Sequence, residues 1–131
     1  MPMPKILVVD DKMEVRICVK AILEDAGYEI DEAENGLVAL NKMQDVNYNT
    51  DLIVTDIMMP ELDGIEFMTA LKIMDRKIPV LAISGGGHAM DANEMLNAAN
   101  QVADHVLTKP FTPDELISAI QTASQNLKKA S

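Results

Sequence analysis

Short apolar runs that alternate with helical patterns are the feature that most constrains this chain. Four runs, Ile6–Val9, Leu52–Val54, Val80–Ile83 and the weaker His105–Leu107, are too short for helices and consist largely of Val, Ile and Leu. Runs with so little polar alternation are typical of strands buried on both faces, as in a parallel sheet. Tyr28–Ala33 alternates in part and predicts a fifth strand at an edge.

Helical patterns follow each of these strands, within residues 15–26, 36–43, 65–71, 95–99 and 113–127. The first includes Cys18 on its apolar stripe, which we expect in the core, and is followed by Gly27 as a C-terminal cap. The last begins with Thr112-Pro113-Asp114-Glu115, which provides an N-cap, a first-turn proline and a capping-box glutamate. Five alternations with short connections predict a doubly wound α/β domain, a five-stranded parallel sheet with helices on both faces.

Length and charge narrow the class of protein. The chain has 131 residues, a usual size for one domain, and we expect a single domain over 1–131 with a core of about 5–127. With 11 basic and 21 acidic residues the net charge is −10, and aromatic residues make up 3%, which disfavours nucleic-acid binding. One cysteine and an N-terminus without an apolar span indicate a cytoplasmic protein that does not enter a membrane.

Polar residues stand where the predicted strands end. The first strand ends in Asp10-Asp11, the third in Asp56, the fourth in Ser84 and the fifth in Thr108-Lys109-Pro110. Parallel strands end at one edge of a sheet, where ligands of such folds bind. Three carboxylates favour Mg²⁺, and a metal beside a lysine and a hydroxyl suits phosphoryl transfer to an aspartate.

Each of these residues also has an ordinary structural explanation. Asp11 could cap the first helix, Ser84 could belong to a glycine-rich loop, and Lys109 could be a solvated side chain. Their joint placement at four strand ends favours a shared site.

Together these motifs resemble the receiver domain of two-component response regulators, of the chemotaxis type, from about Lys5 to Leu127. The resemblance rests on Asp10-Asp11 after ILVV, on the segment DIMMPELDG from Asp56 to Gly64, on Ser84, and on Lys109-Pro110-Phe111. It implies a flavodoxin-like fold with strand order 2-1-3-4-5. It also implies a signalling domain rather than an enzyme, phosphorylated by a sensor histidine kinase or a histidine phosphotransfer protein and acting on a protein target.

The resemblance also assigns roles to individual residues. Asp56 is implied as the phosphoacceptor, and Mg²⁺ is implied to bind Asp10, Asp11, Asp56 and the backbone carbonyl of Met58. Lys109 would pair with the phosphoryl group, Ser84 would move towards it as the switch, and the bond before Pro110 would be cis.

Two positions depart from the family pattern. Val106 replaces the usual switch aromatic, so we expect the signal to pass through backbone and loop movement, helped by Gly85–Gly87. Met58 cannot orient an attacking water by hydrogen bonding, so we expect a phosphoryl group that is not rapidly lost. By resemblance, partners would contact residues 89–104 and the last helix.

Other functions stay open at this point. The chain could be a receiver without an output domain, or one cut from a longer regulator or hybrid kinase. An aspartyl-phosphate phosphatase would need a general acid where Met58 stands. An FMN-binding domain would need a phosphate loop in place of the acidic residues after the first strand. A scaffold that is never phosphorylated is a further alternative.

Overall fold

Five strands and five helices alternate along the chain, as the sequence predicts. The structure is a computed structural model that describes residues 4–59, 62–85 and 92–130, and for 92–96 and 126–130 it describes the backbone alone. The strands are β1 (Lys5–Val9), β2 (Glu29–Ala33), β3 (Leu52–Asp56), β4 (Val80–Ser84) and β5 (His105–Thr108). The helices are α1 (Met13–Asp25), α2 (Gly36–Gln44), α3 (Gly64–Ile73), α4 (Ala92–Val102) and α5 (Pro113–Ala130).

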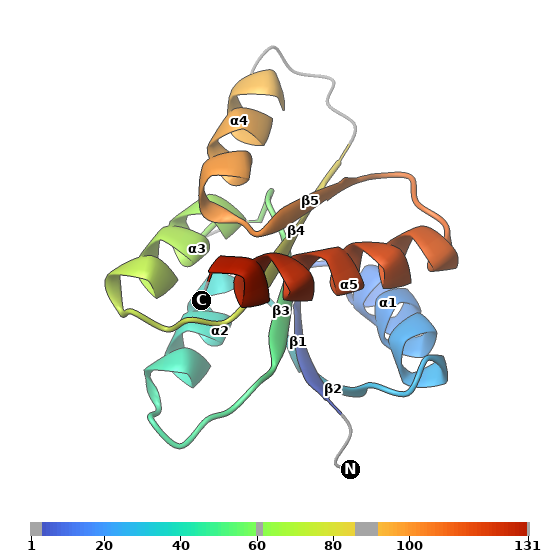
Figure 1. Cartoon of the computed structure of the whole chain (residues 1–131), viewed down its shortest axis with the longest axis horizontal. Helices are drawn as coiled ribbons and strands as arrows, with labels where there is room; N and C mark the ends of the chain where they lie inside the picture. The colour runs from blue at the N-terminus through green and yellow to red at the C-terminus, as the bar shows by residue number, and fades with distance from the viewer. Residues whose placement is uncertain (1–3, 60–61, 86–91, 131) are drawn as a thin grey trace.

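The strands form one parallel sheet in the order β2-β1-β3-β4-β5, which confirms the expected topology. Helices α1 and α5 cover one face, and α2, α3 and α4 cover the other (Figure 1). All five strands therefore end at the same edge of the sheet, so the residues that follow them are brought together there.

Both faces of the central strands are buried, which explains their continuous apolar runs. In β1, Leu7 and Val9 pack in the core beneath α2, α3 and α4, whereas Ile6 and Val8 pack beneath α1 and α5. All four of these side chains are nearly inaccessible to solvent. The edge strand β2 is different, because of its five residues only Ala33 is buried.

Local signals set the ends of several helices. Gly27 follows α1 with a φ of +98°, a left-handed conformation that favours glycine, which confirms the predicted cap. Thr112 and Glu115 form the predicted reciprocal capping box at the start of α5. Asp63 and Glu66 form a second capping box at the start of α3.

The prediction for Cys18 is wrong, because its side chain is exposed. The buried stripe of α1 contains Val19 and Leu23, one helical turn apart. Cys18 precedes Val19 and is turned about 100° from it around the helix axis, which places it outside that stripe. It lines an open groove between α1 and the segment that contains Pro110 and Phe111.

Some sequence predictions concern residues outside the described part of the chain. These are Gly86 and Gly87 of the glycine run, residues 60–61 of the DIMMPELDG motif, and residues 89–91 of the expected partner surface. Within the described residues, no helix combines the length and the apolar character that crossing a membrane requires.

The close approach of α3 to the end of β3 depends on Gly64. The Gly64 N–H donates to the Ile57 carbonyl at 2.9 Å. A Cβ atom on Gly64 would overlap the Asp56 carbonyl oxygen and would lie 2.8 Å from the Ile57 Cα. Both are backbone atoms, so a side chain here forces the turn after β3 to move.

We expect Gly64→Ala to lower the free energy of unfolding by about 2–3 kcal/mol, because backbone atoms cannot yield as a flexible side chain does. Urea unfolding followed by circular dichroism measures the change. Gly85→Ala is the matched control, because nothing lies within 4 Å of a Cβ at that glycine. It should change stability by less than about 0.5 kcal/mol. Equal stability of the two variants would contradict the assignment of a tight turn.

Candidate functional site

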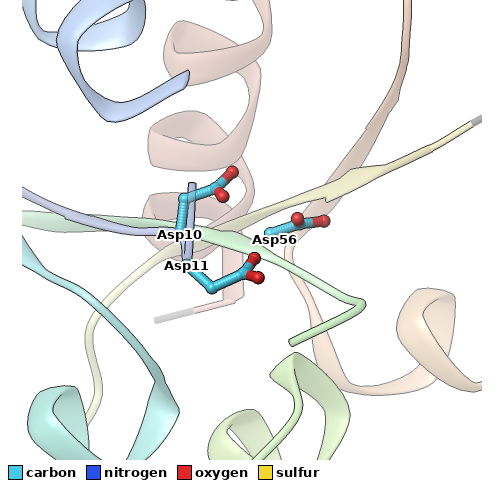
Figure 2. Close-up of side chains that lie close together, drawn as sticks. All are labelled: Asp10, Asp11 and Asp56. Carbon is cyan, nitrogen blue, oxygen red and sulfur yellow. The ribbon is translucent and has the colours of Figure 1, made fainter. Parts of the chain in front are cut away.

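Three aspartates meet at the carboxyl edge of the sheet. Asp10 and Asp11 follow β1, and Asp56 is the last residue of the neighbouring strand β3, whose Thr55 is in register with Val9. One carboxylate oxygen from each of the three lies within 4.8 Å of the others. Figure 2 shows the three side chains gathered at the ends of these two strands. The register of the sheet thus brings together residues 45 or more positions apart in sequence.

Two of these carboxylates are removed from solvent. Asp10 is 3% exposed and Asp56 is 5% exposed, whereas Asp11 is exposed. Burial raises the pKa of Asp10, although the main-chain hydrogen bond from Lys12 works in the opposite direction. Burial likewise raises the pKa of Asp56, opposed by the charge of Lys109 and reinforced by that of Asp10. Ionising Asp10 and Asp56 therefore costs free energy, because a buried charge loses its hydration.

Lys109 supplies one positive charge. Its Nζ lies 3.8 Å from Oδ2 of Asp56, which is close enough for an ion pair but too far for a hydrogen bond. The Lys109–Pro110 peptide bond is cis, and the Lys109 N–H donates to the Ser84 carbonyl at 2.8 Å. Lys109 by itself does not balance the three carboxylates, so the group formed by these four side chains carries excess negative charge.

Three further residues that the sequence analysis singled out are Ser84, Met58 and Val106. Ser84 ends β4 next to β3, in register with Thr108, and its hydroxyl donates to the Gly85 carbonyl at 3.4 Å. Met58 stands two residues after Asp56 with its side chain 62% exposed. Val106 of the outer strand β5 pairs with Ala82 and is packed, partly buried, against the core beneath α2, α3 and α4.

The helix-capping explanation of Asp11 does not apply. The N-cap of α1 is Lys12, and no side chain caps that helix end. The Asp10 side chain accepts a hydrogen bond from the Lys12 N–H at 2.9 Å, which fixes the turn between β1 and α1. The side chain of Asp11 is thereby available to the cluster.

One contact of the site has no signal in the sequence. The Arg16 Nη1 donates to the Asp10 carbonyl oxygen at 2.7 Å, although Arg16 lies one turn into α1. From the sequence, an arginine at this place in an amphipathic helix is expected at the surface. Whether its side chain contacts Asp10 depends on how α1 packs on the sheet.

The donor set fits a magnesium ion. Mg²⁺ takes oxygen ligands, keeps several waters, and is usually held by a small number of carboxylates. The cluster offers two buried carboxylates and a third that faces solvent, with more negative charge than Lys109 offsets.

Comparison with known proteins agrees with this geometry. The response regulator receiver domain family matches residues 6–121. The chemotaxis protein CheY of Listeria monocytogenes is 34% identical over 124 residues, which cover 94% of this chain and 100% of that protein. ResD, a transcriptional regulatory protein of Bacillus subtilis, is 35% identical over 128 residues, covering 97% of this chain and 50% of that protein.

The fold is also shared with solved structures. A response regulator receiver domain protein from Clostridium thermocellum superposes with a TM-score of 0.83 at 28% identity, covering 98% of this chain and 100% of that one. The chain spans the whole of CheY and about half the length of the transcriptional regulators that it matches. Sequence, strand order and family match agree: this chain belongs to the response regulator receiver domain family of two-component signalling.

Proposed function

We propose that this domain accepts a phosphoryl group on Asp56 in a Mg²⁺-dependent reaction and thereby controls a protein partner. The observation that carries the proposal is the cluster of Asp10, Asp11 and Asp56 within 4.8 Å, with Lys109 3.8 Å from Asp56. The donor is the phosphohistidine of a sensor histidine kinase or of a histidine phosphotransfer protein.

In the reaction, a carboxylate oxygen of Asp56 attacks phosphorus, the bond from phosphorus to the histidine nitrogen breaks, and the imidazole leaves. A bound Mg²⁺ would neutralise charge on the phosphoryl oxygens and on the carboxylates around it. Asp10, Asp11 and Asp56 would hold the ion, with the main-chain carbonyl of Met58 as a fourth protein ligand. Lys109 already faces Asp56 and offers its ammonium group to a phosphoryl oxygen.

Phosphorylation would then shift a conformational equilibrium of the domain. The Ser84 hydroxyl stands at the same sheet edge, and its long 3.4 Å hydrogen bond to the Gly85 carbonyl is weak enough to be exchanged for one to a phosphoryl oxygen. Movement of Ser84 would be transmitted through β4 and the Lys109 main chain, which is hydrogen-bonded to Ser84. Val106 offers no rotating aromatic, so the output rests on such backbone movement.

The phosphatase and flavin alternatives fit the site less well. A phosphatase of this chemistry needs a proton donor two residues after its nucleophile, where Met58 has an exposed thioether. A flavin phosphate would meet Asp10 and Asp11 directly after β1.

The net charge of −10 and the lone cysteine fit a cytoplasmic protein that contacts proteins rather than nucleic acid.

Incubation with acetyl phosphate, a small phosphoryl donor, should add one phosphoryl group that requires Mg²⁺ and is removed by hydroxylamine. Intact-protein mass spectrometry measures the adduct. Asp56→Asn should abolish it, whereas Asp25→Asn, a change at an exposed aspartate that ends α1, should leave it intact. An adduct that persists in the Asp56 variant would contradict the assignment of the phosphoacceptor.

Without metal, Asp56→Asn should be more stable than the wild type at pH 7, because it removes a buried negative charge. Burial raises the pKa of Asp56 in the folded state, so this carboxyl binds protons more tightly in the folded chain than in the unfolded chain. Its stabilising contribution is therefore complete at low pH and is lost as pH rises from the ordinary value of 3.8 through the folded pKa. The advantage of the variant should grow over the same interval.

Thermal unfolding at a series of pH values measures this difference. Added Mg²⁺ should stabilise the wild type more than the variant, because an ion that binds the folded state alone stabilises it. Asp25→Asn is again the control, with an expected change under about 0.5 kcal/mol. A wild type that is more stable than the Asp56 variant at pH 7 without metal would contradict the electrostatic argument.

Met58→Asn should shorten the lifetime of the phosphorylated domain. An amide at this position can hydrogen-bond the attacking water, and the net value of one hydrogen bond corresponds to about a tenfold rate increase. Loss of the adduct over time by mass spectrometry gives the lifetime, and Met58→Leu, which keeps the side chain apolar, is the control. An unchanged lifetime in the asparagine variant would show that position 58 does not govern hydrolysis.

A further inference from the structure

Arg16 joins helix α1 to the turn that carries the acidic cluster. Its Nη1 donates to the Asp10 carbonyl oxygen at 2.7 Å, and its Nε lies 3.3 Å from Oε1 of Glu32 on β2. The side chain is only 14% exposed. One guanidinium group thus bridges the end of β1 and the edge strand beside it.

The main chain of Asp10 is held on both sides. Its N–H donates to the Ala33 carbonyl at 3.2 Å, and its carbonyl accepts the hydrogen bond from Arg16. The carboxylate is fixed as well, by the hydrogen bond from the Lys12 N–H at 2.9 Å. Asp10 lies beyond the last residue of β1, so the bond from Arg16 continues the restraint past the end of the sheet.

We propose that Arg16 is a positioning residue for the metal site, acting through the Asp10 carbonyl with Glu32 as its anchor. This inference rests on the proposed Mg²⁺-dependent function. The three carboxylates repel one another, and a turn without restraint would relieve that repulsion by moving Asp10 and Asp11 away from Asp56. Mg²⁺ requires nearly ideal octahedral geometry, whereas Ca²⁺ tolerates irregular sites, so loss of the restraint affects Mg²⁺ more.

A purely electrostatic role for Arg16 makes the opposite prediction. A positive charge beside a cation site disfavours the cation, so its removal would tighten metal binding. Glu32 lies against Arg16 and offsets part of that charge. Lysine keeps the charge but has a single ammonium group in place of a planar fork, and it cannot bridge Asp10 and Glu32 in the same way. Weaker Mg²⁺ binding in the Arg16 variants therefore indicates a positioning role, and tighter binding indicates an electrostatic one.

The test compares Arg16→Lys and Arg16→Gln with Lys20→Gln in the full chain. Lys20 is the matched control because its Nζ lies 3.5 Å from the same Glu32, and its hydrogen bond goes to that glutamate. Calorimetric titration with Mg²⁺ and, separately, with Ca²⁺ gives the two dissociation constants. Circular dichroism melting verifies that each variant is folded.

Both Arg16 variants should raise the Mg²⁺ dissociation constant by about tenfold, and the Ca²⁺ constant by about threefold or less. Lys20→Gln should change either constant by less than about twofold. Should Arg16→Gln fail to fold, Arg16→Lys decides, because it keeps the charge and most of the stem.

Wild-type affinity in Arg16→Lys, tighter binding in Arg16→Gln, or an equal loss in Lys20→Gln would each overturn the inference. If these results accompany a wild type that binds Mg²⁺ and is phosphorylated on Asp56, the inference alone fails. A wild type that binds no Mg²⁺ contradicts the proposed function and the positioning role together.

Discussion

Repulsion among three carboxylates at one edge of the sheet is the constraint on which the rest of this structure depends. Asp10 and Asp56 are almost fully buried, the charge of Asp10 raises the cost of ionising Asp56, and the charge of Asp11 raises the cost of ionising Asp10. Lys109 is the cation that reaches Asp56, and it offsets only part of this charge. Packing elsewhere in the domain must therefore offset the unfavourable free energy of these clustered carboxylates, as is usual for a functional site and the fold that carries it.

That stability comes from the parallel sheet. Central strands with both faces covered bury continuous runs of Val, Ile and Leu, and two separate cores form beneath the two helical layers. In the same architecture every strand ends at one edge, so one sheet both stabilises the domain and brings the site residues together. The tight approach of Gly64 to the end of β3, and the hold of Arg16 on Asp10, fix that edge on either side of the cluster.

The site itself could be predicted in large part from the sequence, because a parallel sheet converts position after a strand into position in space. Asp10, Asp11, Asp56 and Lys109 lie together as the strand ends indicated. Cys18 was misplaced because an apolar stripe read from spacing alone has uncertain edges, and one residue around the helix separates core from surface. Arg16 was missed because the sequence around an arginine near a helix start does not show which group its side chain contacts.

The sequence by itself determined the alternation of strands and helices, the parallel sheet and the residues placed at its edge. Periodicity and chain order encode these features, since both are local properties of the chain. Tertiary structure alone decided which carboxylates are buried, how closely Lys109 approaches Asp56, and that Arg16 reaches the Asp10 carbonyl. Those quantities depend on the packing of α1 against β1 and β2 and on strand register, which join residues distant in sequence, so no local pattern specifies them.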